Sequence, residues 1–170
     1  MSTIVCDGKM LAVDMMNIVG GTKHNVLSDN IYVLDTDTDS DPPHHVIIVC
    51  IGDKAQSAYF VEHFNTLRDP VVSQKFRSLF GEPTFTAYVY YTIDKSSEMY
   101  HGMQYISSVD YRCMSIGSGS RYALGALEAG ADSISALKIA AKYDLLTDSF
   151  AIQYVDLSKP LVEVRYLDYQ

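Results

Sequence analysis

Short apolar runs separated by turn signals occupy the first third of the chain, a pattern typical of β-strands. Two of these runs, residues 3–6 and 10–13, flank Asp7-Gly8, a dipeptide typical of a tight hairpin turn. Residues 30–34 form a third short run, and residues 46–51 form a continuous apolar run typical of a buried strand. The chain is therefore predicted to begin with β structure.

The middle of the chain changes from a strand pattern to a helix pattern and back. Apolar residues between 53 and 67 recur near helical spacing. A shorter helix is predicted over residues 71–80, because Pro70 precedes it and Gly81 follows it. Three further strands are then expected, over residues 84–93, 98–106 and 111–116.

The last third predicts two more helices and two more strands. One helix is expected over residues 120–129 and the next begins at Asp132-Ser133, a capping signal. Residues 150–157 and 161–167 complete the pattern as strands. Strands and helices that alternate in blocks indicate an α+β protein. We expect one domain over residues 1–170, a four-layer αββα sandwich of two antiparallel sheets with a helix pair on each outer side.

Composition removes several classes of function. The net charge of −8 argues against nucleic acid as a partner, because such binding depends on Lys and Arg that neutralise phosphates. No apolar run approaches the roughly 20 residues that cross a bilayer, and the first residues have no signal-peptide pattern. The three cysteines lie in apolar, strand-like segments and are interpreted as free buried thiols. We therefore expect a cytoplasmic protein that contacts no membrane.

Residues 115–130, SIGSGSRYALGALEAG, suggest a phosphate-binding loop, but the pattern is incomplete. Tyr122 stands where a dinucleotide fingerprint needs its third glycine, and no Gly-Lys-Ser/Thr follows. The acidic turn over residues 35–45 likewise lacks the glycine and glutamate of an EF-hand, at Ser40 and Val46. We expect no cofactor and no bound metal.

Four motifs occur in an order that resembles the proteasome β-subunit and HslV-type peptidase family of N-terminal-nucleophile hydrolases. The resemblance covers residues 2 to about 157, and the glycine-serine motif is its most specific part. The family has a much longer helix at residues 71–80. The motifs are STIV with LAVD at 2–5 and 11–14, IGDKAQ at 51–56, IGSGS with YALG at 116–120 and 122–125, and AAKYD at 140–144.

This resemblance implies a peptidase in which the first residue of the mature chain attacks a peptide carbonyl. Ser2 matches the nucleophile, provided that Met1 is removed so that the α-amino group can accept the hydroxyl proton. Asp14 and Asp144 match two carboxylates of the site, Ser118 matches its serine, and Thr147 stands at a second serine position. The backbone donor to the oxyanion would fall at Val49 or Cys50.

Three departures from the family pattern leave a second interpretation open. Asn30 stands at the position of the family's lysine, and an amide cannot lower the pKa of the amine as a cation does. Lys23 is near in sequence but is expected in a loop. Asp148-Ser149 replaces a glycine pair, and Ile18 replaces a threonine. The alternative is a catalytically degenerate ring protein that retains Met1 and has a structural or interaction role.

The resemblance also implies assembly. A homo-oligomeric ring, with rings stacked in pairs, is expected for either interpretation. An ATP-dependent unfoldase is a possible partner of the active form.

Overall fold

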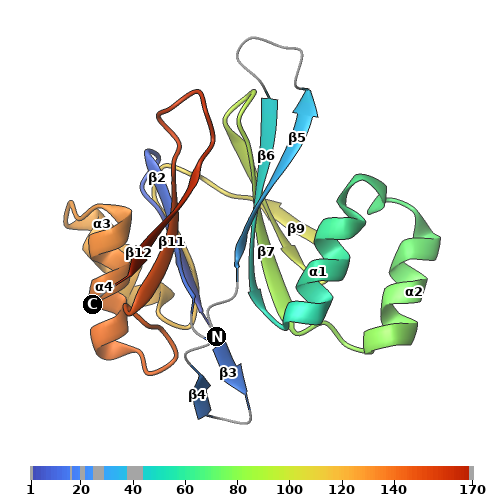
Figure 1. Cartoon of the computed structure of the whole chain (residues 1–170), viewed down its shortest axis with the longest axis horizontal. Coiled ribbons are helices and arrows are strands. Elements are labelled where there is room, and N and C mark those ends of the chain that lie inside the picture. Colours follow the sequence, from blue (N-terminus) through green and yellow to red (C-terminus); the bar gives the residue numbers. More distant parts are fainter. Residues whose placement is uncertain (1, 16, 20–21, 25–28, 38–43, 169–170) are drawn as a thin grey trace.

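The computed structural model describes residues 2–15, 17–19, 22–24, 29–37 and 44–168 (Figure 1). Met1 and most of the acidic turn, residues 38–43, lie outside the described part. The chain forms a four-layer αββα sandwich, as the sequence predicts. Two five-stranded antiparallel sheets face each other, and a pair of helices covers the outer side of each sheet (Figure 1).

The first sheet contains the start and the end of the chain. Its strands, in spatial order, are β10 (Met114–Gly117), β1 (Thr3–Cys6), β2 (Met10–Asp14), β11 (Ala151–Asp156) and β12 (Val164–Asp168). Gly8, with a positive φ of 85°, lies in the β1–β2 turn that Asp7-Gly8 predicts. This sheet therefore brings residues 2–3, 14 and 117 to adjacent strands.

The second sheet is a simple meander. Its strands, in order, are β5 (Ile31–Asp37), β6 (His44–Gly52), β7 (Phe85–Tyr91), β8 (Ser96–His101) and β9 (Gln104–Ser108). A separate hairpin consists of β3 (Asn17–Val19) and β4 (Thr22–His24). The prediction of a loop around Lys23 is therefore wrong, because Lys23 lies in β4.

The helices end close to the predicted positions, with one exception. α2 (Pro70–Phe80), α3 (Ser120–Glu128) and α4 (Ser133–Tyr143) match the predictions, and Asp132 caps α4 through the Ser135 N–H. α1 (Lys54–Glu62) is shorter than the predicted 53–67, because the backbone tightens into the 3₁₀ turn Phe64–Thr66.

Two other predictions from the sequence are wrong. The single strand expected over residues 98–106 is a hairpin, because the chain turns at Gly102, where φ is 59°. Cys6 and Cys50 are buried, and burial raises the pKa of each thiol to about 12. Cys113, however, is exposed, so the prediction of three buried thiols fails at this residue.

Three apolar clusters hold the layers together. The central cluster fills the space between the two sheets, with Ile4 and Leu11 from one side and Ile47 and Tyr88 from the other. A second cluster packs the first sheet against α3 and α4, and a third packs the second sheet against α1 and α2. Each sheet is thus buried on both faces.

Candidate active site

The site is centred on Asp14, the last residue of β2. The Thr3 N–H donates to Asp14 Oδ1 at 2.5 Å, and the Asp148 N–H donates to Asp14 Oδ2 at 3.1 Å. The carboxyl group is completely buried. Burial raises its pKa to about 7, against the opposing effect of these two hydrogen bonds. Asp14 therefore changes protonation close to neutral pH.

The glycine-serine turn after β10 passes against the start of the chain. Gly117 has φ of 114° and pairs with Thr3 in the sheet, and a Cβ there would lie 2.1 Å from the Ser2 carbonyl oxygen. A Cβ on Gly119 would lie 2.6 Å from Thr147 Oγ1 and 2.9 Å from Thr3 Oγ1. Both glycines are required because the backbone approaches the chain start too closely for any side chain.

A chain of hydroxyl groups connects this turn to the end of α4. The Gly119 N–H donates to Thr3 Oγ1 at 2.9 Å, and Thr3 Oγ1 lies 2.6 Å from Thr147 Oγ1. Thr147 donates to Asp144 Oδ2 at 2.5 Å, and Ser118 donates to the same oxygen at 2.6 Å. The Thr3 hydroxyl is therefore the donor to Thr147, because the single proton of Thr147 is used by Asp144.

Asp144 is the ionised member of this group. Desolvation alone would raise the pKa of Asp144, but the hydrogen bonds from Ser118 and Thr147 lower it below its ordinary value. The site thus contains two carboxyl groups in different environments. Asp144 is charged at neutral pH, whereas Asp14 is close to its titration midpoint.

Asn30 lies next to Asp14, immediately before β5. It is buried, and its side-chain amide donates to the Asp14 carbonyl oxygen at 2.7 Å. The Asn30 backbone N–H donates to Gln153 Oε1 at 2.6 Å, and Gln153 is itself fully buried in β11. These two bonds fix Asn30 between the first sheet and the second.

Lys54, the first residue of α1, reaches the same place from the second sheet. Its ammonium group donates to Asn30 Oδ1 and, at 3.1 Å, to the Asp29 carbonyl oxygen. In the sequence, Lys54 is only an extra residue within the IGDKAQ motif, and no pattern of residues indicates that it contacts Asn30. Thr3 and Gln153 were also not predicted, although Thr3 is adjacent to Ser2.

The structure brings together five of the six predicted site residues through hydrogen bonds: Asp14, Asn30, Ser118, Asp144 and Thr147. The sixth, Ser2, is buried, and it is joined to Thr3 of the network by its peptide bond. The backbone N–H of Val49 or Cys50 is the predicted donor to the oxyanion. The Cys50 N–H is already used, because it donates to the Asn30 carbonyl oxygen at 2.9 Å. Whether these residues catalyse a reaction stays a prediction.

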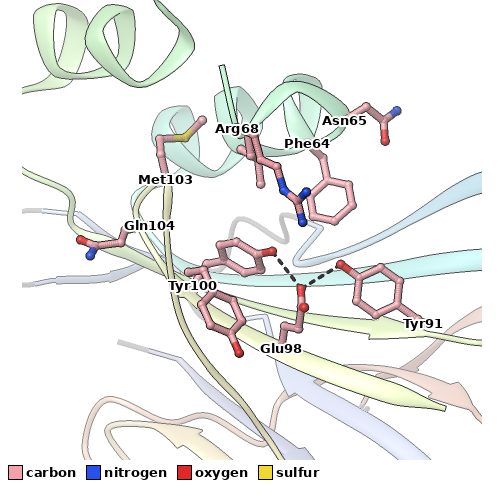
Figure 2. Close-up of a pocket in the computed structure, with 10 residues that line it drawn as sticks. Phe64, Asn65, Arg68, Tyr91, Glu98, Tyr100, Met103 and Gln104 are labelled. Atoms are coloured by element: carbon pink, nitrogen blue, oxygen red, sulfur yellow. Dashed lines mark hydrogen bonds between the residues drawn. The ribbon is translucent and has the colours of Figure 1, made fainter. Parts of the chain in front are cut away.

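A separate surface pocket of about 660 Å³ lies where the second sheet meets the end of α1 (Figure 2). Tyr91 and Tyr100 both donate to Glu98 Oε2, at 2.9 and 2.8 Å. Phe64 and Arg68 line the opposite wall (Figure 2). None of its lining residues belongs to the Asp14 network, so the pocket is not part of the candidate active site.

The described residues contain no group of three or more His, Cys, Asp or Glu side chains placed to hold a metal ion. Within the same part of the chain, none of the helices has the length and apolar character needed to span a bilayer.

Solved structures share this fold. An Anbu protein (a Gly-1 mutant) from Hyphomicrobium sp. strain MC1 has a TM-score of 0.70 at 13% identity, over 98% of this chain and 86% of that one. The eukaryotic HslV of Trypanosoma brucei has a TM-score of 0.63 at 15% identity, over 99% of this chain and 100% of that one. The helical assembly of the Anbu complex from Pseudomonas aeruginosa has a TM-score of 0.61 at 10% identity, covering 96% and 81%.

These similarities show that the chain shares the fold of the HslV and Anbu structures. They do not distinguish HslV-type proteins from Anbu-type proteins. No protein-family model matches the sequence, and no curated protein matches it.

Proposed function

We propose that the protein is a subunit of a self-compartmentalising, proteasome-like peptidase that uses Ser2 as its N-terminal nucleophile. The observation that carries this proposal is the buried polar network between Thr3, Asp14, Gly119, Thr147 and Asp144. Buried polar groups are costly unless they are hydrogen-bonded. The network holds Thr3, the residue that follows the proposed nucleophile, through both its N–H and its hydroxyl group.

The proposed reaction requires Ser2 to carry a free α-amino group. The Ser2 hydroxyl oxygen attacks the carbonyl carbon of the peptide bond, and its proton passes to the α-amino group. The C–N bond then breaks, and the same proton is transferred to the leaving amine. Water hydrolyses the ester that remains on Ser2, and this step regenerates the hydroxyl group.

Two features of the structure support a fixed position for Ser2. Its carbonyl group lies against Gly117, where no side chain fits. The next residue, Thr3, is held through both its N–H and its hydroxyl group, by Asp14 on one side and by Gly119 and Thr147 on the other. Such a restrained start of the chain is what a positioned nucleophile requires.

The experiment is a peptidase assay on protein that begins at Ser2. A cleavable N-terminal fusion would leave Ser2 as the first residue, and intact mass would verify this. We expect turnover of fluorogenic peptides or of an unfolded protein, and its loss in Ser2→Ala. The control is Ser78→Ala, which changes an exposed serine on α2. Equal rates for the parent protein and Ser2→Ala, or no turnover by verified protein, would contradict the proposal.

A second function is favoured by one observation, namely that Asn30 occupies the place of the family's lysine. In this alternative, the chain forms the same type of assembly without peptidase activity. Recovery of the protein from its native source with Met1 intact, together with assembly, would support it. Efficient Ser2-dependent cleavage would exclude it.

We propose a homo-oligomer for both functions, as a ring or stacked rings, in the cytoplasm. The support is the fold, which the Pseudomonas aeruginosa Anbu complex uses in a helical assembly. An ATP-dependent unfoldase stays a proposed partner of the active form. Light scattering at micromolar concentration tests the assembly, and a monomer would contradict it.

A further inference from the structure

We propose that Lys54, at the first turn of α1, supplies the positive charge beside the N-terminal residue that Asn30 cannot carry, and that Asn30 holds this ammonium group toward Asp14. The inference rests on the proposed function, because it names the residue that sets the charge of the same site. Lys54 is a positioning residue in this proposal, since it acts through Asn30.

The hydrogen bonds define the route. The Lys54 ammonium donates to Asn30 Oδ1, and the Asn30 side-chain amide donates to the Asp14 carbonyl oxygen at 2.7 Å. Asp14 Oδ1 in turn accepts the N–H of Thr3, the residue joined to Ser2. Asn30 therefore uses both ends of its amide, one for the cation of the second sheet and one for the main chain of the first.

Three neighbouring residues fix the position of the Lys54 backbone at the start of α1. Gly52 has φ of 112°, and a Cβ there would lie 2.3 Å from the Thr84 carbonyl oxygen. The Asp53 side chain caps the helix by accepting the Gln56 N–H at 2.9 Å. Gln56 Oε1 accepts the Thr84 N–H at 2.8 Å and so ties the helix start to the beginning of β7. The first turn of α1 is thus attached to the sheet, and Lys54 with it.

The position of Lys54 is unfavourable for a lysine that has no other role. Cations at the N-terminus of a helix oppose the helix dipole, an effect that the Asp53 carboxylate at the N-cap offsets only in part. Burial lowers the pKa of the Lys54 ammonium, which means that desolvation also disfavours its charge. Helix formation and packing therefore do not account for a lysine here, whereas a need for charge beside Asp14 does.

Among the described residues, the titratable groups that interact with the Lys54 ammonium are a thiol and carboxyl groups, and none of them is a cation. The Cys50 thiol is neutral, because burial raises its pKa to about 12. The carboxyl groups that interact with the Lys54 ammonium are Asp14 on β2 and Asp29 before β5, and Asp53 precedes Lys54 as the cap of α1. A positive charge in this setting favours the ionised form of Asp14 and the neutral form of a nearby amine.

The test removes the charge of Lys54 in steps. Lys54→Met removes the charge and the hydrogen bonds, Lys54→Gln removes the charge but keeps a donor, and Lys54→Arg keeps the charge. Lys75→Met, on the exposed side of α2, is the matched control for net charge. The double variant Asn30→Lys with Lys54→Met returns the charge from the position of Asn30, the position that matches the family's lysine. The first readout is the pH profile of kcat/KM for protein that begins at Ser2.

We expect Lys54→Met and Lys54→Gln to move the acidic limb of this profile up by about one pH unit and to reduce the rate at pH 7 by about tenfold. Lys54→Arg, Lys75→Met and the double variant should keep the limb near its original position. An unchanged limb in Lys54→Gln would overturn the proposal. Thermal unfolding of each variant verifies that the protein is folded before its profile is read.

A second readout does not depend on peptidase activity. In the Ser2→Ala background, the carboxyl carbon of Asp14 can be titrated by NMR after labelling of the aspartates. We expect the Asp14 midpoint to rise in Lys54→Gln and to stay unchanged in Lys75→Met. If the parent protein has no peptidase activity, the proposed function fails, and the Asp14 titration alone decides the role of Lys54. Equal midpoints in Lys54→Gln and the parent would then overturn it.

Discussion

The two helix layers pack against their sheets with different kinds of side chain. α3 and α4 use small residues against the first sheet, and α1 and α2 use aromatic rings against the second. The small residues are Ala123, Ala126, Ala136 and Ala140, and the aromatic ones are Tyr59, Phe60, Phe76 and Phe80. Ala140 lies close to the glycine-serine turn, because a Cβ added to Gly119 would lie 3.1 Å from the Cβ of Ala140.

The two layers therefore have different tasks. The layer of α3 and α4 places side chains of the site accurately, and the layer of α1 and α2 supplies buried apolar volume. Small side chains let α4 approach the first sheet closely enough for Asp144 and Thr147 to join the network at Thr3. The aromatic layer instead stabilises the second sheet through the hydrophobic effect, and it borders an open pocket at Glu98 (Figure 2). Each of the following experiments acts on one of these two parts.

The largest effect is expected from a cavity in the aromatic layer. Phe60 is fully buried and its ring contacts those of Phe64, Phe85 and Tyr100. Phe60→Ala should lower the free energy of unfolding by about 3–5 kcal/mol, measured by denaturant unfolding. Phe150→Ala, at an exposed phenylalanine, is the control and should change it little. Similar losses in the two variants would contradict the role of this layer.

The next effect concerns the pH dependence of stability near Asp14. A carboxyl whose pKa is raised to about 7 in the folded state binds more protons than the unfolded chain between about pH 4 and pH 7. The free energy of unfolding therefore falls as pH rises through this range, by roughly 2–4 kcal/mol in total. Asp14→Asn should remove that decline, which denaturant unfolding at a series of pH values would measure. Parallel pH curves for the two proteins would rule this out.

A smaller effect is expected where α4 meets the glycine-serine turn. Gly119→Ala places a methyl group against Thr147 and Thr3, and should lower stability by about 1–3 kcal/mol. It should also separate the hydroxyl groups of Thr3 and Thr147. Thermal unfolding and the peptidase rate of protein beginning at Ser2 are the measurements, and a variant as stable as the parent would contradict the close approach.

The smallest effect is expected at a glycine of the same helix layer that has room. A Cβ on Gly125, inside α3, would meet no atom within 4 Å. Gly125→Ala should therefore raise stability by about 0.5–1 kcal/mol, because alanine favours the helix. A loss of stability measured by thermal unfolding would show that α3 does not have the space assigned to it.

Most of the fold could be predicted from the sequence, because its elements have clear local signals. Asp7-Gly8 marks the first hairpin, Gly81 ends α2 and Asp132 begins α4. The errors occur where the signal is weak. The three-residue strands β3 and β4 are too short for an alternating pattern, and the turn at Gly102 interrupts residues that otherwise have the composition of one strand.

The candidate site could be predicted only as far as residues align with a known pattern along the chain. Asp14, Ser118 and Asp144 were predicted in this way, and they lie in one network. Lys54 could not be predicted, because its partner Asn30 is on another strand and 24 positions away. Their contact depends on the register of β5 against β6, in which the Cys50 N–H donates to the Asn30 carbonyl oxygen. No local rule of sequence contains that information.

The carboxyl group of Asp14 belongs to the first sheet and the ammonium group of Lys54 to the second. The distance between the two charges therefore depends on how the two sheets are aligned. Sliding one sheet past the other by the length of a single hydrogen bond would leave every covalent group in place and yet separate Asn30, with the Lys54 ammonium bound to it, from Asp14 and Gln153.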